Sequence, residues 1–329
     1  MQKPLIITMG DPTGVGPEII VKALLEGDLD PYLPALVVAG DLHVLQRAAT
    51  LFGVEAGVAD GHLLIAGKAL KVQGLTDLPA AELKYGSPDA EAGRAMVDYI
   101  DWAAEQCLSG RAAGLVTAPI NKKAINDAGI DFPGHTELLA DRCNVGKVVM
   151  MLAGDRLKVC LVTTHLPLAA VPSALSLGEI LETIRITDNA LRKKFGLEQP
   201  RLAVLSLNPH AGESGLFGDE EERLILPAIE AAKEAGIEAS GPHSADTLFH
   251  FAAAGDYDAV ICMYHDQGLI PLKLLHFEDG VNVTLGLPIV RTSVDHGTAY
   301  DLAGTGQASS ASLVAAIRMA EKMINPKKL

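Results

Sequence analysis

Residues 5–25, with the sequence LIITMGDPTGVGPEIIVKALL, decide the fold class of this chain. The first five of them form a short apolar run, which ends in a connection rich in Gly and Pro. A helical pattern then starts at Pro17, and proline is favoured at the first position of a helix. An apolar strand followed directly by a helix is the repeating unit of parallel sheets.

The rest of the chain repeats this alternation. We expect strands at residues 35–39, 114–118, 148–152, 157–163, 202–207 and 259–263, and helices at 87–108, 176–195, 219–236 and 307–324. Ser87 is the predicted N-cap of the helix at 87–108, and Pro88 its first residue. Residues 153–156, AGDR, predict a hairpin and therefore one antiparallel pair. The predicted class is α/β, with a mostly parallel sheet covered by helices on both faces.

Length and charge narrow the class of protein. The chain has 329 residues, which corresponds to about two domains. Its hydrophobic fraction of 49% supports a large core and excludes a disordered protein. The formal net charge of −14 argues against nucleic acid or an anionic membrane surface as a partner, because both require a basic face. The N-terminus resembles neither a signal peptide nor a membrane span, so we expect a cytoplasmic protein.

The chain has four cysteines, and none stands in a C-x-x-C pair. Cys160 and Cys262 lie within apolar runs. We interpret them as small buried side chains rather than as parts of a disulfide or metal framework.

Three of the ten histidines share one sequence context. His165, His210 and His265 each follow a predicted buried strand and begin a loop. Ligands of α/β sheets bind at the carboxyl ends of the strands, so three imidazoles at that edge predict a metal site with positions left open for a substrate. Imidazole suits Zn, Co, Ni, Fe or Mn. The alternative is that each histidine is an ordinary loop residue, since their spacing matches no short zinc motif.

Other polar residues have two interpretations each. Asp246 and Asp266 are candidate acid/base residues or carboxylates that orient metal ligands, but they could also make turns or cap helices. Cations near strand or loop ends that could hold a phosphate or carboxylate are Lys122, Lys123, Lys273 and Arg291. Lys122 and Lys123 could equally be solvated surface cations, whereas Lys273 lies in an apolar run and needs a partner.

Three segments are candidates for binding an anion or a nucleotide. Residues 10–18, GDPTGVGPE, open a helix, where backbone N–H groups can face an anion, but they do not match G-x-G-x-x-G. Residues 133–137 offer an imidazole and a hydroxyl at a predicted helix start. Residues 293–306 form a Gly-rich polar loop that can wrap a nucleotide. The first and last segments could also be only structured connections.

Six motifs taken together point to a known family. They are GDPTGVGPE (10–18), GHTE (134–137), THLP (164–167), LNPHAGE (207–213), MYHDQG (263–268) and RTSVDHGTA (291–299). In this order, and over essentially the whole chain, they resemble the 4-hydroxythreonine-4-phosphate dehydrogenase family, which has an isocitrate/isopropylmalate dehydrogenase-like fold. Residues 10–18 and 296–304 also resemble segments of those wider dehydrogenases, the second being their adenosine-binding loop.

The resemblance implies a role for individual residues. His165, His210 and His265 match the divalent-metal ligands of the family, with zinc, cobalt, magnesium or manganese as the ion. The substrate-binding positions fall on His135, Thr136, Lys273, Asn282 and Arg291. Asp246 and Asp266 lie in matching motifs and are the candidate catalytic residues. The site for NAD, or NADP, corresponds to residues 295–304 and includes Asp295, His296, Gly297 and Gly304.

The implied reaction is oxidation of the 3-hydroxyl of 4-phosphohydroxy-L-threonine by NAD. Loss of carbon dioxide then gives 3-amino-1-hydroxyacetone phosphate for pyridoxal phosphate synthesis. A divalent ion beside the hydroxyl would lower its pKa and later stabilise the charge that develops on decarboxylation. The cations would hold the phosphate of this small phosphorylated amino acid.

The implied architecture has two α/β domains with the active site in the cleft between them. Residues 1–130 with 295–329 would carry much of the NAD site, and residues 131–294 would carry the metal ligands and the dimer contact. One metal ligand of the family comes from the partner subunit. We assign that role to His265, which implies a homodimer.

Three other functions remain open. A paralogous 3-dehydrogenase for 4-phospho-D-threonate or 4-phospho-D-erythronate would use the same metal, cofactor loop and cations. An NAD-independent metal hydrolase or lyase would use the three histidines without residues 295–304. A non-catalytic binding protein of the same fold would have no reason to place three imidazoles at strand ends.

Overall fold

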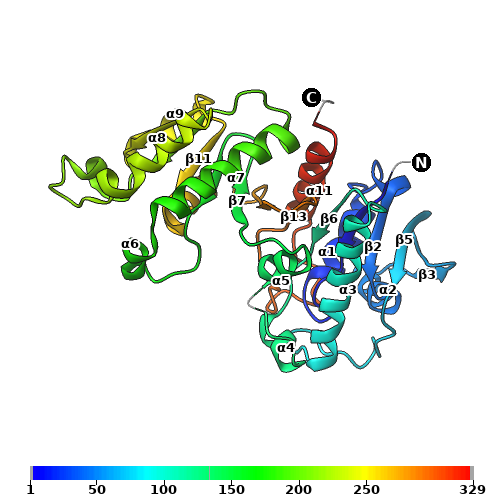
Figure 1. Cartoon of the computed structure of the whole chain (residues 1–329). Coiled ribbons are helices and arrows are strands. Elements are labelled where there is room, and N and C mark those ends of the chain that lie inside the picture. Colours follow the sequence, from blue (N-terminus) through cyan, green and yellow to red (C-terminus); the bar gives the residue numbers. More distant parts are fainter. Residues whose placement is uncertain (1–2, 133, 327–329) are drawn as a thin grey trace. The chain divides into compact units, whose positions relative to one another are not determined.

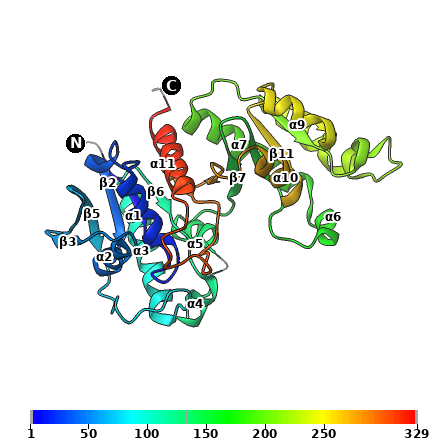
Figure 2. The same cartoon turned by 180° about the vertical axis from the view of Figure 1, so that it is seen from behind.

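The computed structural model describes residues 3–132 and 134–326 (Figure 1; Figure 2, from behind). The chain divides into two compact units. Unit 1 comprises Met1–Gly146 and Leu287–Ile324, and unit 2 comprises Lys147–Gly286 and Asn325–Leu329. Each unit has its own strands and covering helices.

Unit 1 contains strands in the order β13–β6–β1–β2–β5–β4–β3. From β13 to β5 they run parallel, and β4 and β3 continue antiparallel. Their bounds are β1 (Leu5–Thr8), β2 (Leu36–Gly40), β3 (Ala56–Ala59), β4 (His62–Ile65), β5 (Lys68–Gly74), β6 (Gly114–Thr117) and β13 (Arg291–Ser293). The predicted apolar runs form the fully buried strands β1, β2 and β6. Strand β3 lies at the edge of the sheet, is mostly exposed and consists of small residues around Val58, and it is not among the predicted strands.

The helices of unit 1 are α1 (Gly16–Glu26), η1 (Leu33–Ala35), α2 (Leu42–Thr50), α3 (Ala90–Leu108), α4 (Lys122–Asp127), α5 (His135–Arg142) and α11 (Ala311–Ile324). Several of them, including α2, α3 and α11, contact the sheet, whereas α4 and α5 contact α3. The prediction of Ser87 as N-cap of α3, with Pro88 first, is wrong. Asp89 is the cap, because its backbone is extended and its carboxylate accepts a 2.9 Å hydrogen bond from the N–H of Ala92.

The unit borders lie after Gly146 and Gly286, whereas the sequence predicts them after residues 130 and 294. Long-range packing explains the difference, since α5 contacts α3 and β13 pairs with β6, both within unit 1. His135 and Arg291 consequently belong to the same unit as residues 295–304.

Unit 2 contains strands in the order β10–β9–β11–β8–β7–β12. The first four are parallel, and β7 and β12 are antiparallel to their neighbours. Their bounds are β7 (Val149–Ala153), β8 (Lys158–Leu161), β9 (Leu202–Leu205), β10 (Ala239–His243), β11 (Ala259–Cys262) and β12 (Val281–Leu285). The predicted hairpin is confirmed, because β7 and β8 pair and the N–H of Gly154 donates a 2.9 Å bond to the carbonyl of Leu157.

Helices cover both faces of this sheet. They are η2 (Leu168–Ala170), α6 (Val171–Ala174), α7 (Leu177–Phe195), η3 (Pro209–Gly212), η4 (Glu221–Ile225), α8 (Leu226–Glu234), α9 (Ala245–Ala254) and α10 (His265–Leu275). Val159 of β8 packs in one core cluster with residues of α9 and α10, whereas the next residue, Cys160, faces Thr187 of α7. The predicted α/β class with a mostly parallel sheet is confirmed. Of the helices described, none is both long and apolar enough to cross a membrane.

The cysteines behave as predicted from their apolar context. Cys160 and Cys262 are buried, and neither belongs to a disulfide. Burial raises the pKa of Cys160 to about 12, so this thiol is not a reactive group at neutral pH.

Gly93 of α3 allows α4 to approach closely. A Cβ at residue 93 would lie 2.0 Å from the carbonyl oxygen of Ala124, a backbone atom of α4. Any larger residue would therefore push α4 away from α3. This contact sets the position of the first residue of α4, Lys122.

We predict that Gly93→Ala destabilises the protein. The clash should lower the free energy of unfolding by about 1–3 kcal/mol, despite the helix propensity that alanine gains. Urea denaturation measures the change. Gly146→Ala is the matched control, because no atom lies within 4 Å of its added Cβ, and it should change stability by less than about 0.5 kcal/mol. An equal effect of the two substitutions would contradict this packing.

Candidate active site

Three neighbouring parallel strands of unit 2 deliver the predicted metal ligands. β11 lies between β8 and β9. His165 follows β8, His210 lies in η3 after β9, and His265 begins α10 after β11. Because parallel strands end at a common edge, all three histidines lie on the carboxyl edge of the sheet, where α/β proteins bind ligands.

His165 and His265 form a close pair. Their ring centroids are 5.5 Å apart, and the ring planes are tilted by 44°. Nδ1 of His265 lies 2.7 Å from Oδ1 of Asp266, so Nε2 is the ring nitrogen that could bind a metal ion. A carboxylate on the outer nitrogen is the usual way to orient a metal-binding imidazole. When two imidazoles bind one ion through metal–nitrogen bonds of about 2.0–2.1 Å, their ring centroids lie about 5–6 Å apart. The spacing of this pair is therefore compatible with a shared divalent transition-metal ion.

His210 lies in a tight loop held by a buried glutamate. The backbone of His210 is left-handed, with φ of 53°. Oε1 of Glu221 accepts 2.8 Å hydrogen bonds from the N–H groups of Leu207 and Asn208, and its Oε2 accepts one of 3.0 Å from the Asn208 side chain. Glu221 thus fixes the turn that presents His210.

Asp246 and His210 line the same cavity of about 540 Å³. Asp246 lies in the first turn of α9 and accepts a 2.7 Å hydrogen bond from the hydroxyl of Ser244. Of the predicted catalytic carboxylates, Asp246 therefore faces a cavity, whereas Asp266 contacts a predicted metal ligand. Within residues 3–132 and 134–326, no three His, Cys, Asp or Glu side chains gather closely enough to hold a metal ion. One chain thus assembles the His165–His265 pair but not a three-ligand site.

Unit 1 holds a buried cation. Arg291, the first residue of β13, is 2% exposed, and its Nη2 donates a 2.8 Å hydrogen bond to Oγ1 of Thr117 at the end of β6. Burial lowers the pKa of Arg291 to about 10, and the Glu137 carboxylate opposes this shift. Arg291 therefore remains charged at neutral pH. A buried guanidinium of this kind suits an anionic ligand.

His135 adds an uncharged imidazole to the same unit. Burial, followed by the positive charges of Arg291 and Lys122, holds the pKa of His135 well below its usual value. Its Nε2 is buried and has no hydrogen-bond partner in the described part of the chain. Thr136 follows in the first turn of α5. Because an unsatisfied buried nitrogen is costly, a ligand atom that bonds to Nε2 would be favoured.

The remaining two predicted substrate-binding residues belong to unit 2. The ammonium of Lys273 lies 5.6 Å from the centroid of the Phe277 ring, which supplies one partner for this charge. Asn282 of β12 has a buried Oδ1 for which the described residues offer no hydrogen-bond donor. The predicted substrate set is thus divided between the units, with His135, Thr136 and Arg291 in unit 1.

The predicted cofactor loop, residues 295–304, is attached to residues 10–18. The carbonyl of Thr298 accepts a 3.1 Å bond from the N–H of Val15, and the N–H of Gly304 donates a 2.9 Å bond to Oε2 of Glu18. A Cβ at residue 304 would lie 2.3 Å from the Tyr85 ring, so only glycine fits there. The predicted cofactor residues exposed on this loop are His296 and Gly297.

A network of side-chain hydrogen bonds, which the sequence does not predict, holds this loop in place. The hydroxyl of Tyr300 donates a 2.5 Å bond to Oδ2 of Asp11, and Nδ2 of Asn121 donates a 2.6 Å bond to the Tyr300 oxygen. Asp11 is fully buried, and burial raises its pKa. The sequence singled out both segments, residues 10–18 and 293–306, but gave no signal that Tyr300 and Asp11 are bonded to each other, because they are far apart in the chain.

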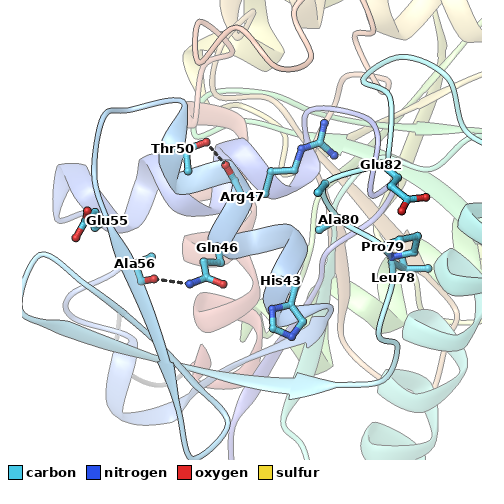
Figure 3. A pocket seen from close by; sticks show the side chains of 11 residues that line it. His43, Gln46, Arg47, Thr50, Glu55, Ala56, Leu78, Pro79, Ala80 and Glu82 are labelled. Atoms are coloured by element: carbon cyan, nitrogen blue, oxygen red, sulfur yellow. Dashed lines mark hydrogen bonds between the residues drawn. The ribbon is translucent and has the colours of Figure 1, made fainter.

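A second cavity, of about 710 Å³, lies between α2 and residues 78–82 and contains none of the predicted site residues (Figure 3). The Arg47 guanidinium lies 3.9 Å from the centre of the Tyr85 ring, the ring that also contacts Gly304. Glu55 and Glu82 line the same cavity. Charges of both signs therefore face it, and they favour no single class of ligand.

The low pKa of His135 predicts a loss of stability on acidification. The unfolded chain binds a proton at this imidazole below about pH 6.5, whereas the folded chain does not. The free energy of unfolding therefore falls as the pH drops below this value. In His135→Gln, the slope of the free energy of unfolding against pH, between about pH 6 and 5, should be shallower than in the wild type by up to about 1.4 kcal/mol per pH unit. Denaturation at a series of pH values measures it, with exposed His43→Gln as the control; equal slopes in the two variants would contradict a neutral His135.

This chain is similar to known proteins over almost its whole length. A family model described as pyridoxal phosphate biosynthetic protein PdxA matches residues 33–320. A 4-hydroxythreonine-4-phosphate dehydrogenase from Geobacter metallireducens is 55% identical over 327 residues, which cover 98% of this chain and 96% of the relative.

Two solved structures are also similar. A 4-hydroxythreonine-4-phosphate dehydrogenase from Klebsiella pneumoniae is 41% identical, with a TM-score of 0.89. The superposition covers 98% of this chain and 100% of the Klebsiella chain. A terephthalate 1,2-cis-dihydrodiol dehydrogenase from Burkholderia xenovorans LB400 is 29% identical, with a TM-score of 0.67 and coverage of 97% and 98%. The family resemblance carried by the six motifs is confirmed, and this chain belongs to the PdxA family of pyridoxal phosphate biosynthetic proteins.

Proposed function

We propose that this chain uses NAD to oxidise the 3-hydroxyl of 4-phosphohydroxy-L-threonine, and that decarboxylation then gives 3-amino-1-hydroxyacetone phosphate. The observation that carries the proposal is the buried pair of charged Arg291 and neutral His135, which suits a phosphorylated substrate. The relative from Geobacter metallireducens is named for this substrate. The product would enter pyridoxal phosphate synthesis in the cytoplasm.

Different residues of the chain make different contacts with the substrate. Arg291 and Lys273 supply positive charge, and His135, Thr136 and Asn282 supply directional hydrogen bonds. Fixing the phosphate at one end of a small substrate sets the place of its hydroxyl at the other. Asp246, which faces the cavity beside His210, is the candidate for proton transfer.

His165, His210 and His265 would hold one divalent ion, with zinc, cobalt, magnesium or manganese as candidates. When bound, the ion supplies Lewis-acid stabilisation of the negative charge that develops on the substrate. Asp266 orients His265 through the 2.7 Å contact to Nδ1. Residues 295–304 would hold NAD, with NADP as the alternative, and the cofactor accepts the hydride.

A homodimer would complete the metal site. Helix α10 begins with His265, and it carries apolar side chains that water reaches: Ile270 is 67% exposed and Leu274 85%, with Phe277 at 78% just beyond the helix. Exposed apolar side chains gathered on one element mark an interaction surface. A second copy of this chain is the partner that this proposal requires, since one copy brings only two of the three histidines together.

Two divisions of the ligands between subunits are possible. The family resemblance assigns the crossing ligand to His265. The 5.5 Å separation of the His165 and His265 rings instead favours these two on one ion, with the partner subunit's His210 as the third ligand.

Mixed dimers test this division. Refolding His165→Ala chains with His210→Ala chains should restore about a quarter of the wild-type metal content, because about half of the dimers are mixed and one of their two sites is intact. Mixing His165→Ala with His265→Ala should restore none. Bound zinc per subunit measures the outcome, and His250→Ala is the control that keeps full content. Recovery in the second mixture but not in the first would assign the crossing ligand to His265.

The activity itself is tested by NADH formation with added divalent metal. We expect 4-phosphohydroxy-L-threonine to be oxidised with release of carbon dioxide, and 4-phospho-D-threonate and 4-phospho-D-erythronate to react at least about tenfold more slowly in kcat/KM. The similarity to a dihydrodiol dehydrogenase makes this panel necessary, because related chains act on other substrates. Preference for a phospho-sugar acid would replace the proposed substrate.

A further inference from the structure

Lys122 and Lys123 are consecutive residues in α4, but their surroundings differ. The ammonium of Lys123 forms an ion pair with Asp127, one turn along the helix, and the Lys123 side chain is 82% exposed. Lys122 instead lies against Gly134, the residue before α5. A Cβ at Gly134 would be 3.2 Å from Cε of Lys122 and 3.5 Å from its Nζ. The sequence alone presents these two lysines as equivalent, and the fold distinguishes them.

Lys122 decides the net charge of the cluster around His135. Arg291 is positive and Glu137 is negative, and both influence the same group of side chains. Oε2 of Glu137 would lie 3.2 Å from the same Cβ position at Gly134. His135 is neutral, so these three residues together carry no net charge. With Lys122 included, the cluster becomes positive.

We propose that Lys122 binds the phosphate group of the substrate together with His135 and Arg291. This inference rests on the proposed function, and it adds to the site a cation that lies nearer the surface than buried Arg291. An ammonium is a compact charge with three donors, which suits a phosphate oxygen. Lys123 takes no part in this binding.

The fold positions Lys122 from two sides. Oδ1 of Asn121 accepts a 2.8 Å bond from the N–H of Ala124 and caps α4, while its Nδ2 donates to Tyr300. Gly93 allows the helix to rest directly on α3. Successive helical residues point about 100° apart, so Lys123 cannot reach the place that Lys122 occupies.

Binding of inorganic phosphate to the full chain, without substrate or cofactor, provides the test. Titration calorimetry should show a dissociation constant about tenfold higher for Lys122→Gln than for wild type, since one charge-assisted contact is lost. Lys123→Gln, the matched control, should bind within about twofold of wild type, because it removes the same charge from the same helix. Lys122→Arg should recover most of the affinity.

Three results would overturn the proposal. Equal weakening in Lys122→Gln and Lys123→Gln would show a general effect of surface charge. Unchanged phosphate binding in Lys122→Gln, or the absence of phosphate binding to the wild-type chain at millimolar concentration, would exclude Lys122 as a ligand. Weakened binding of acetate but not of phosphate would assign Lys122 to a carboxylate instead.

A kinetic measurement separates binding from structure. Lys122→Gln should raise KM for the phosphorylated substrate about tenfold with kcat unchanged, as expected for a contact made equally in ground and transition states. If no candidate substrate reduces NAD while phosphate binding still depends on Lys122, the proposed reaction fails and the Lys122 assignment stands. The two ideas are therefore tested separately.

Discussion

Parallel strands deliver the residues that follow them to one edge of a sheet, and both candidate sites of this protein depend on that constraint. In unit 2, β8, β11 and β9 are neighbours, so His165, His265 and His210 share an edge although they are far apart in the chain. In unit 1, β1 and β6 are neighbours, and so are β6 and β13. The loop at residues 10–18, the start of α4 and the loop at 295–304 follow these strands and form one hydrogen-bonded structure.

The second governing feature is the buried charge of Arg291. Removing a guanidinium from water is expensive unless other groups satisfy it. Thr117 accepts one of its hydrogen bonds, and Glu137 opposes the loss of its proton. Nε2 of His135, which finds no hydrogen-bond partner among the described residues, adds a second group that a ligand would satisfy. Groups buried in this way support the proposal that the unit binds an anion.

The proposed division of the three histidines between subunits would have a physical cause. His165 and His265 follow adjacent strands and meet within one chain. His210 lies in a left-handed loop held by Glu221 and faces the cavity that it shares with Asp246. The apolar residues exposed on α10 would give the proposed second copy a surface to pack on. Metal binding and assembly would then be coupled.

Local sequence patterns were enough to predict many of the buried strands, the family and the sheet edge shared by the three histidines. Continuous apolar runs predicted the buried strands β1, β2, β6, β8, β9 and β11, because a strand buried on both faces has no polar alternation. The six motifs identified the family, and the strand-end rule predicted the shared edge of the three histidines. These signals lie within short stretches of sequence.

Tertiary structure decided what depends on contacts between distant residues. The unit borders follow from α5 packing on α3 and β13 pairing with β6. Tyr300 bonds to Asp11 from 289 residues away, and no local pattern connects them. Lys122 and Lys123 are identical side chains side by side in the sequence, yet one lies beside Gly134 and the other pairs with Asp127. A residue's neighbours in sequence set its local conformation, but only packing sets which charges it meets.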